Sequence, residues 1–129
     1  ADAAALASEV LSRGARRDQG VERAARLMLA DSLVQLGQFD AAGAQLRSLG
    51  STHLPLREHL MRLTIEIEYL GRTRQWAELH RRTAELLPMV ELFPPTATAR
   101  GHLWLAIAAA ASGDAATART LRRRAELLG

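Results

Sequence analysis

The residues that decide the fold are 27–46, LMLADSLVQLGQFDAAGAQL. Up to Leu36, apolar residues recur at the three- and four-residue spacing of a helix, without the strict alternation of a strand. Gly37 is a residue type that commonly ends a helix, and Phe39 opens a second apolar pattern of the same period. The stretch therefore predicts a helix, a tight turn and a second helix.

The same arrangement occurs twice more along the chain. The first helix of each pair ends near a glycine, Gly37, Gly71 or Gly113, and the second interval between these glycines is longer than the first. Aligned on them, a large residue precedes a small one and an apolar residue follows three positions later: Leu29-Ala30-Leu33, Leu63-Thr64-Ile67 and Leu105-Ala106-Ala109. A small residue lets a neighbouring helix approach closely. The longer interval is assigned to insertions in loops, about three residues at 72–75 and about five at 89–93, where extra length costs little.

The second helices also match one another. Phe39, Trp76 and Ala115 occupy equivalent places near their starts, and Ala42 and Ala118 lie where the two helices of a pair come close. In the first two pairs the aromatic ring is predicted to act as a wedge between the helices. The third pair keeps the small residues and lacks the aromatic.

These positions resemble the tetratricopeptide repeat family, whose helix–turn–helix units of about 34 residues stack into a right-handed superhelix. The interval from Gly37 to Gly71 has the length of one such unit. The resemblance implies one all-α domain over residues 1–129, with a leading helix at 2–13 and three repeats at 21–50, 55–88 and 96–128. The alternative is an ordinary helical bundle, which has no extended concave face.

The predicted helices, with no strand, are 2–13, 21–36, 39–49, 55–71, 75–87, 96–112 and 115–128. The fifth stops before Pro88, and Pro94-Pro95 excludes helix through the connector that follows.

Composition is consistent with a single helical domain and excludes several function classes. The chain has 129 residues, no cysteine, and 17 basic residues that are all arginine. Without cysteine it has no thiolate chemistry and no cysteine zinc site. A net charge of +3 falls short of the clustered basic face of a nucleic-acid binder. No run approaches the ~18 apolar residues of a membrane span, so we expect no membrane insertion and a cytoplasmic location.

The start of the sequence indicates a piece of a longer protein. The chain has no initiator methionine, and it begins inside the helix predicted at residues 2–13. We therefore expect it to be a fragment whose targeting signals, if the whole protein has them, lie elsewhere.

The sequence contains no recognisable active site. His53, His59, His80 and His102 lack the spacing to carboxylates that a metal site needs. A lysine-containing phosphate loop is excluded because the chain has no lysine, and no serine lies in a nucleophile-elbow pattern. We predict a protein without enzymatic activity, cofactor or metal.

In the family that the chain resembles, the first helix of each pair lines a concave groove, which implies a partner-binding site here. Its predicted residues are Leu27, Met28, Asp31, Met61, Arg62, Ile65, Tyr69, Arg100, Leu103, Trp104 and Ile107. The mostly apolar set suits a partner helix or an extended peptide. Arg62, Arg100 and Asp31 are expected to orient the partner, and Trp104 or Tyr69 to be the binding hot spot. The family's carboxylate clamp is not expected, because its lysine and asparagine side chains are absent from this chain.

Two other functions stay open. The first is a segment of a larger bacterial signalling or transcriptional regulator, in which longer helical repeats sense an effector or self-associate. The irregular repeat lengths favour this possibility. The second rests on Arg119, Arg122 and Arg123, which share one side of the last predicted helix. They are either a solvated face near a helix C-terminus or a patch for an acidic segment, a phosphate or nucleic acid.

Overall fold

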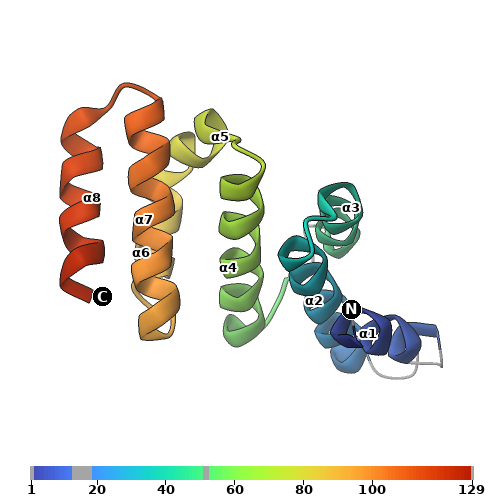
Figure 1. The fold of residues 1–129 in the computed structure, drawn as a ribbon. Helices are drawn as coiled ribbons and strands as arrows, with labels where there is room; N and C mark the ends of the chain where they lie inside the picture. Colours follow the sequence, from blue (N-terminus) through green and yellow to red (C-terminus); the bar gives the residue numbers. More distant parts are fainter. Residues whose placement is uncertain (1, 13–18, 51–52, 129) are drawn as a thin grey trace. The chain divides into compact units, whose positions relative to one another are not determined.

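The computed structural model describes residues 2–12, 19–50 and 53–128 (Figure 1). Over these residues the chain forms eight helices and no strand, which confirms the all-α prediction. The helices are α1 (Asp2–Ser12), α2 (Gln19–Gln35), α3 (Phe39–Leu49), α4 (Leu56–Arg72), α5 (Trp76–Arg81), α6 (Thr83–Val90), α7 (Pro95–Ala111) and α8 (Ala115–Leu128).

The chain divides into two compact units, Ala1–Ile65 and Glu66–Gly129, with the division inside α4. In the first unit, α2 packs against α1 and α3. In the second, α7 packs against α8 and also contacts α5 and α6. The antiparallel arrangement of α7 and α8 is plain in Figure 1. These contacts are those of helical hairpins, in which the apolar stripe of each helix is buried against its neighbour.

The first helices are spaced differently from the glycines on which the sequence alignment was based. The first helices, α2, α4 and α7, are each 17 residues long and begin at Gln19, Leu56 and Pro95. The second helices, α3, α5 and α8, keep the same intervals and begin at Phe39, Trp76 and Ala115. The predicted alignment of the second helices is therefore confirmed. Both intervals are longer than the repeat unit of about 34 residues. The first helices keep the same intervals as the second helices, so the unequal spacing predicted for them from Gly37, Gly71 and Gly113 is wrong.

All three first helices end in the same turn. The residue with left-handed backbone geometry is Gly37 after α2, Arg74 after α4 and Gly113 after α7, with φ of 78°, 56° and 84°. In each turn, this residue's N–H donates to the carbonyl three residues earlier, and the next N–H donates to the carbonyl five residues earlier, over 2.8–3.1 Å. This hydrogen-bond pair is the Schellman motif, which satisfies carbonyls at a helix end.

Gly71 is consequently not a turn residue, although the sequence alignment placed it there. It lies inside α4, so the alignment of the first helices is wrong by three residues in the second repeat. The residue that corresponds to Ala30 is Ile67, and the one that corresponds to Leu33 is Leu70. The error arose because glycine is the usual residue at a left-handed position, and after α4 an arginine occupies it instead.

The absence of a side chain at Gly71 allows the close approach of an aromatic ring. A Cβ atom at this position would lie 2.5 Å from both Cδ2 and Cε3 of Trp104. The indole therefore lies against the backbone of α4, at a distance that any larger residue would prevent.

The single helix predicted at 75–87 is instead two helices, α5 and α6. Between them, Arg82 has φ −90° and ψ 2°. The hydroxyl of Thr83 donates to the carbonyl of Leu79 over 3.3 Å, which is an interaction that bends helices.

Pro88 lies inside α6, so the prediction that helix stops before it is also wrong. Proline has no backbone N–H, so α6 loses one hydrogen-bond donor at Pro88. On the same helix, however, Leu86 and Val90 are fully buried. Burying such a side chain is worth about 1.5–3 kcal/mol, which offsets the lost hydrogen bond. α6 ends at Val90 and α7 begins at Pro95, which confirms that Pro94-Pro95 excludes helix through the connector. None of the described helices is long and apolar enough to span a membrane.

Candidate functional site

The predicted partner-binding residues are divided between the two units and differ in exposure. Those on the surface are Met28, Asp31, Met61, Arg100, Leu103 and Ile107, and those half-buried are Arg62, Tyr69 and Trp104. Leu27 and Ile65 have only 0% and 3% of their surface exposed. These two are corrections to the predicted site, because a side chain without exposed surface cannot contact a partner. Leu27 lies on the face of α2 that also carries the buried residues Ala30 and Val34.

Arg62 binds its own chain. Its guanidinium donates to the carbonyl of Gly50 over 2.7 Å, at the C-terminal end of α3. A cation at this place complements the partial negative charge of a helix C-terminus. The contact ties α4 to the end of α3 within the first unit.

A buried carboxylate in the second unit, that of Glu68 on α4, accepts four side-chain hydrogen bonds. Its Oε1 accepts hydrogen bonds from Nε of Arg100 and, over 2.7 Å, from Nε1 of Trp104. Its Oε2 accepts from Nε of Arg72 over 2.8 Å and from Nη2 of Arg100 over 2.9 Å. Residues from α4 and α7 therefore converge on one carboxylate, which we call the Glu68 cluster (Glu68, Arg72, Arg100 and Trp104).

The Glu68 cluster keeps its carboxylate ionised. Burial by itself raises the pKa of Glu68, but the hydrogen bonds from Arg100, Arg72 and Trp104 more than offset it and hold the pKa at about 2. The hydrogen bonds between Arg100 and Glu68 also raise the pKa of Arg100. A buried charge that accepts four charge-assisted or indole hydrogen bonds satisfies its lone pairs, which is the condition under which such a charge is tolerated.

Arg100 and Trp104, which the sequence analysis assigned to partner binding, both donate hydrogen bonds to Glu68 in this cluster. The Trp104 ring also lies 6.1 Å from the ring of Trp76, measured between centroids, and the Arg100 guanidinium lies 5.7 Å from the Trp104 ring. Sequence analysis did not identify Glu68 as their partner. The available signal was the pair Glu68 and Arg72, four residues apart on one helix face.

A second charged cluster joins α6, α7 and α8. Glu91, just after α6, accepts hydrogen bonds from Arg124 over 3.0 and 3.3 Å. The same carboxylate lies 3.0 Å from Nε2 of the buried His102, whose Nδ1 lies 2.8 Å from the Thr98 carbonyl. The arginine lowers the pKa of Glu91. Among the arginines of α8, Arg124 is the one that lies toward α6 and belongs to this cluster.

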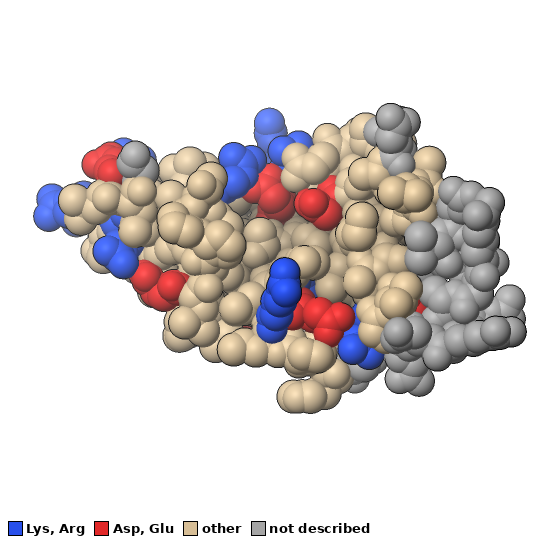
Figure 2. Space-filling view, turned by 90° about the horizontal axis from the view of Figure 1, so that it is seen from below, with Lys and Arg blue, Asp and Glu red and all other residues tan. Residues whose placement is uncertain are grey.

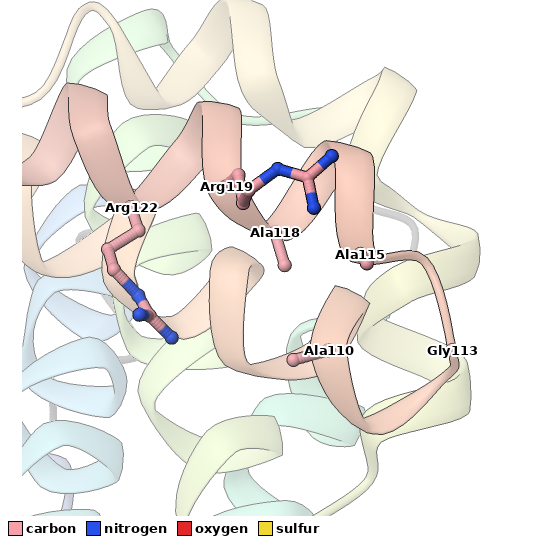
Figure 3. A pocket seen from close by; sticks show the side chains of 6 residues that line it. All are labelled: Ala110, Gly113, Ala115, Ala118, Arg119 and Arg122. Atoms are coloured by element: carbon pink, nitrogen blue, oxygen red, sulfur yellow. The ribbon is translucent and has the colours of Figure 1, made fainter.

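The other side of the α7–α8 hairpin carries an apolar strip and a pocket. Leu103, Ile107 and Ala110 are exposed and share one face of α7. Next to Ala110, a pocket of about 260 Å³ is lined by Ala110, Gly113, Ala115, Ala118, Arg119 and Arg122 (Figure 3). Figure 3 shows the small side chains of Ala110 and Ala118 in the space between the helices, with the two arginines extending from α8. We call this surface (Leu103, Ile107 and the pocket residues) the hairpin face.

Several described arginines pair with a carboxylate, whereas the two arginines of the hairpin face pair with none that the structure describes. Arg23, Arg26, Arg72, Arg81, Arg82, Arg100 and Arg124 each form an ion pair. Figure 2 shows one face of the molecule, on which basic and acidic side chains lie beside one another. Arg119 and Arg122 form no ion pair or side-chain hydrogen bond with any residue that the structure describes. The sequence drew attention to these arginines but not to the alanine-lined pocket beside them.

Comparisons with models of protein families, with curated protein sequences and with solved structures found no match. Among residues 2–12, 19–50 and 53–128, no three histidine or acidic side chains are grouped so that they could hold a metal ion.

Proposed function

We propose that the chain is a non-enzymatic protein-interaction module that binds a partner helix or extended peptide on its first helices. The observation that carries the proposal is the exposure of large apolar side chains on these helices. Met28 and Met61 in the first unit are 47% and 42% exposed, and Leu103 and Ile107 in the second are 45% and 38% exposed. Singly exposed apolar side chains are ordinary, whereas those that gather on one face mark interaction sites. Leu103 and Ile107 gather in this way on one face of α7, and methionine adapts to varied partners.

The recurrence of the helix pairs supports this proposal and the tetratricopeptide-like superhelix behind it. Three first helices of equal length end in one type of turn and are followed by second helices at matching intervals. In the family that the chain resembles, stacked helix pairs present an extended binding surface lined by their first helices. On this proposal each pair is a slightly longer variant of the family's unit, since the pairs recur at intervals somewhat above 34 residues.

A second candidate is the helical-repeat segment of a larger regulator, which self-associates through the same exposed residues. The helix intervals favour it, because they exceed the tetratricopeptide unit and the alternative involves longer repeats. Light scattering coupled to size-exclusion chromatography separates the two functions. A concentration-dependent dimer that is lost on mutating Leu103 and Ile107 supports self-association, whereas a monomer at all concentrations argues against it.

The direct test of partner binding uses charge substitutions on the exposed strip. In the double variant Leu103→Glu/Ile107→Glu, we expect affinity for a partner isolated with the full-length protein to fall at least about tenfold, because two apolar contacts become buried carboxylates. Leu127→Glu is the matched control, since Leu127 is 75% exposed and lies outside the hairpin face. Circular dichroism should show unchanged helix content in both variants. Equal affinities for the two variants would contradict the proposal.

A further inference from the structure

We infer that the hairpin face binds an acidic amphipathic helix, with carboxylates of the partner on Arg119 and Arg122 and its apolar residues on Leu103 and Ile107. The inference deepens the proposed function and rests on it. It adds the chemistry of the partner and the residues that recognise it.

The geometry provides an apolar strip beside a polar anchor. Leu103 and Ile107 are one helical turn apart, which matches apolar side chains at positions i and i+4 of a partner helix. The pocket follows directly after them at Ala110, and its alanine walls leave space for the methylene groups of a glutamate. The guanidinium groups of Arg119 and Arg122 stand beside that space (Figure 3).

The charges indicate that the bound group is an anion. Arg119 and Arg122 are three residues apart on α8, so their positive charges repel one another. No carboxylate of the described chain neutralises them, whereas Arg124 on the same helix pairs with Glu91. A carboxylate from a partner would remove the repulsion and gain charge-assisted hydrogen bonds to both guanidiniums.

The apolar surroundings favour an acidic peptide over a phosphate or nucleic acid. Nucleic-acid sites combine several basic residues that follow a phosphate backbone, while only two arginines line this pocket and its other lining residues are alanine or glycine. Leu103 and Ile107 extend the surface with apolar area that a phosphate could not cover. An acidic amphipathic helix complements both parts at once.

The test compares two synthetic helical peptides that differ only in charge. Both carry leucines spaced to form one apolar face, and one has glutamates along an edge of that face where the other has glutamines. Fluorescence anisotropy at low salt should give an affinity at least about tenfold higher for the glutamate peptide, and high salt should reduce the difference. In Arg119→Gln/Arg122→Gln we expect the two peptides to bind equally.

The matched control is Arg123→Gln, which removes the same kind of charge from α8 at a residue that does not line the pocket. This variant should retain most of the preference for the glutamate peptide. If both peptides bind wild type equally, and lose affinity only in Leu103→Glu/Ile107→Glu, the acidic anchor is wrong while the proposed function stands. If neither peptide binds, or the Arg123→Gln variant loses as much preference as the double arginine variant, the assignment of the hairpin face is overturned.

Discussion

At the scale of single residues, Trp104 brings together side chains that are distant in the sequence. Its N–H donates to the Glu68 carboxylate, and its ring lies against the backbone at Gly71. The ring is also near Trp76 at the start of α5. These contacts position Trp104 for packing between helices of its own unit. The exposed Leu103 and Ile107 on the same helix are therefore better placed than Trp104 for the partner contact that we propose.

The contact between Gly71 and Trp104 predicts that replacing the glycine by alanine destabilises the protein, which is the reverse of the usual effect within a helix. Within a helix, replacing glycine by alanine normally stabilises by roughly 0.5–1 kcal/mol. In Gly71→Ala we expect instead a loss of about 1–3 kcal/mol, because the new methyl group overlaps the rigid indole. Urea denaturation gives both free energies of unfolding.

The control is the same substitution in a Trp104→Ala background, where the space is free. There, Gly71→Ala should become neutral or stabilising, so that the two changes are strongly non-additive. A loss of equal size in both backgrounds would show that the indole is not the cause.

At the scale of helices, the turn that ends each first helix determines where the next helix begins. After α2 and α7 a glycine takes the left-handed position, and after α4 Arg74 takes it with the same two backbone hydrogen bonds. The bonds place the chain for the next helix, so Phe39, Trp76 and Ala115 become the first residues of α3, α5 and α8. The turn geometry is therefore the same in all three pairs, while the residue that supplies it changes.

The different residues in this turn predict opposite effects of two substitutions. Left-handed geometry costs a residue with a side chain about 1–2 kcal/mol relative to glycine. Arg74→Gly should therefore stabilise the protein by about 1 kcal/mol, and Gly37→Ala should destabilise it by a similar amount. Thermal unfolding followed by circular dichroism measures both.

Arg74→Ala separates conformation from charge, since it removes the guanidinium and keeps the Cβ atom. We expect little change in its melting temperature. Stabilisation by Arg74→Ala as large as that by Arg74→Gly would show that the charge, and not the backbone strain, is responsible.

Helix type and most helix bounds could be predicted from the apolar spacing, because that signal is local. The glycine alignment failed at α4 because it could not distinguish a glycine needed for a turn from one needed for contact with Trp104. The prediction that helix stops before Pro88 failed for a similar reason. Its local preference ends a helix, and the burial of Leu86 and Val90, which outweighs that preference, is a property of the packed unit.

At the scale of the whole molecule, the residues that the sequence assigned to a partner differ in exposure. Met28, Met61, Leu103 and Ile107 are exposed, whereas Leu27 and Ile65 are buried. The Glu68 cluster could not be predicted, because its members lie as far as 36 residues apart and meet only when α4 and α7 are packed. The pocket of the hairpin face depends likewise on how closely α7 and α8 approach.

The buried carboxylate of Glu68 gives the protein a predictable response to acid. Its pKa of about 2 in the folded state lies below its ordinary value of 4.5. A lowered pKa adds stability that is fully present above the unfolded-state value and is lost as the pH falls from about 4.5 towards 2. The shift corresponds to a contribution on the order of 3 kcal/mol at neutral pH.

We expect Glu68→Gln to lower the free energy of unfolding by that order of magnitude at pH 7, because the amide is neutral and leaves Arg100 and Arg72 without their anion. Since protonated Glu68 is also neutral, the difference between wild type and variant should narrow as the pH is lowered from 5 to 2. Glu78→Gln is the control, because Glu78 pairs with Arg81 on an exposed helix surface, where ion pairs contribute little. Urea titrations at several pH values measure these differences. A gap between wild type and Glu68→Gln that stays constant down to pH 2 would mean that the interior of the second unit does not depend on an ionised carboxylate.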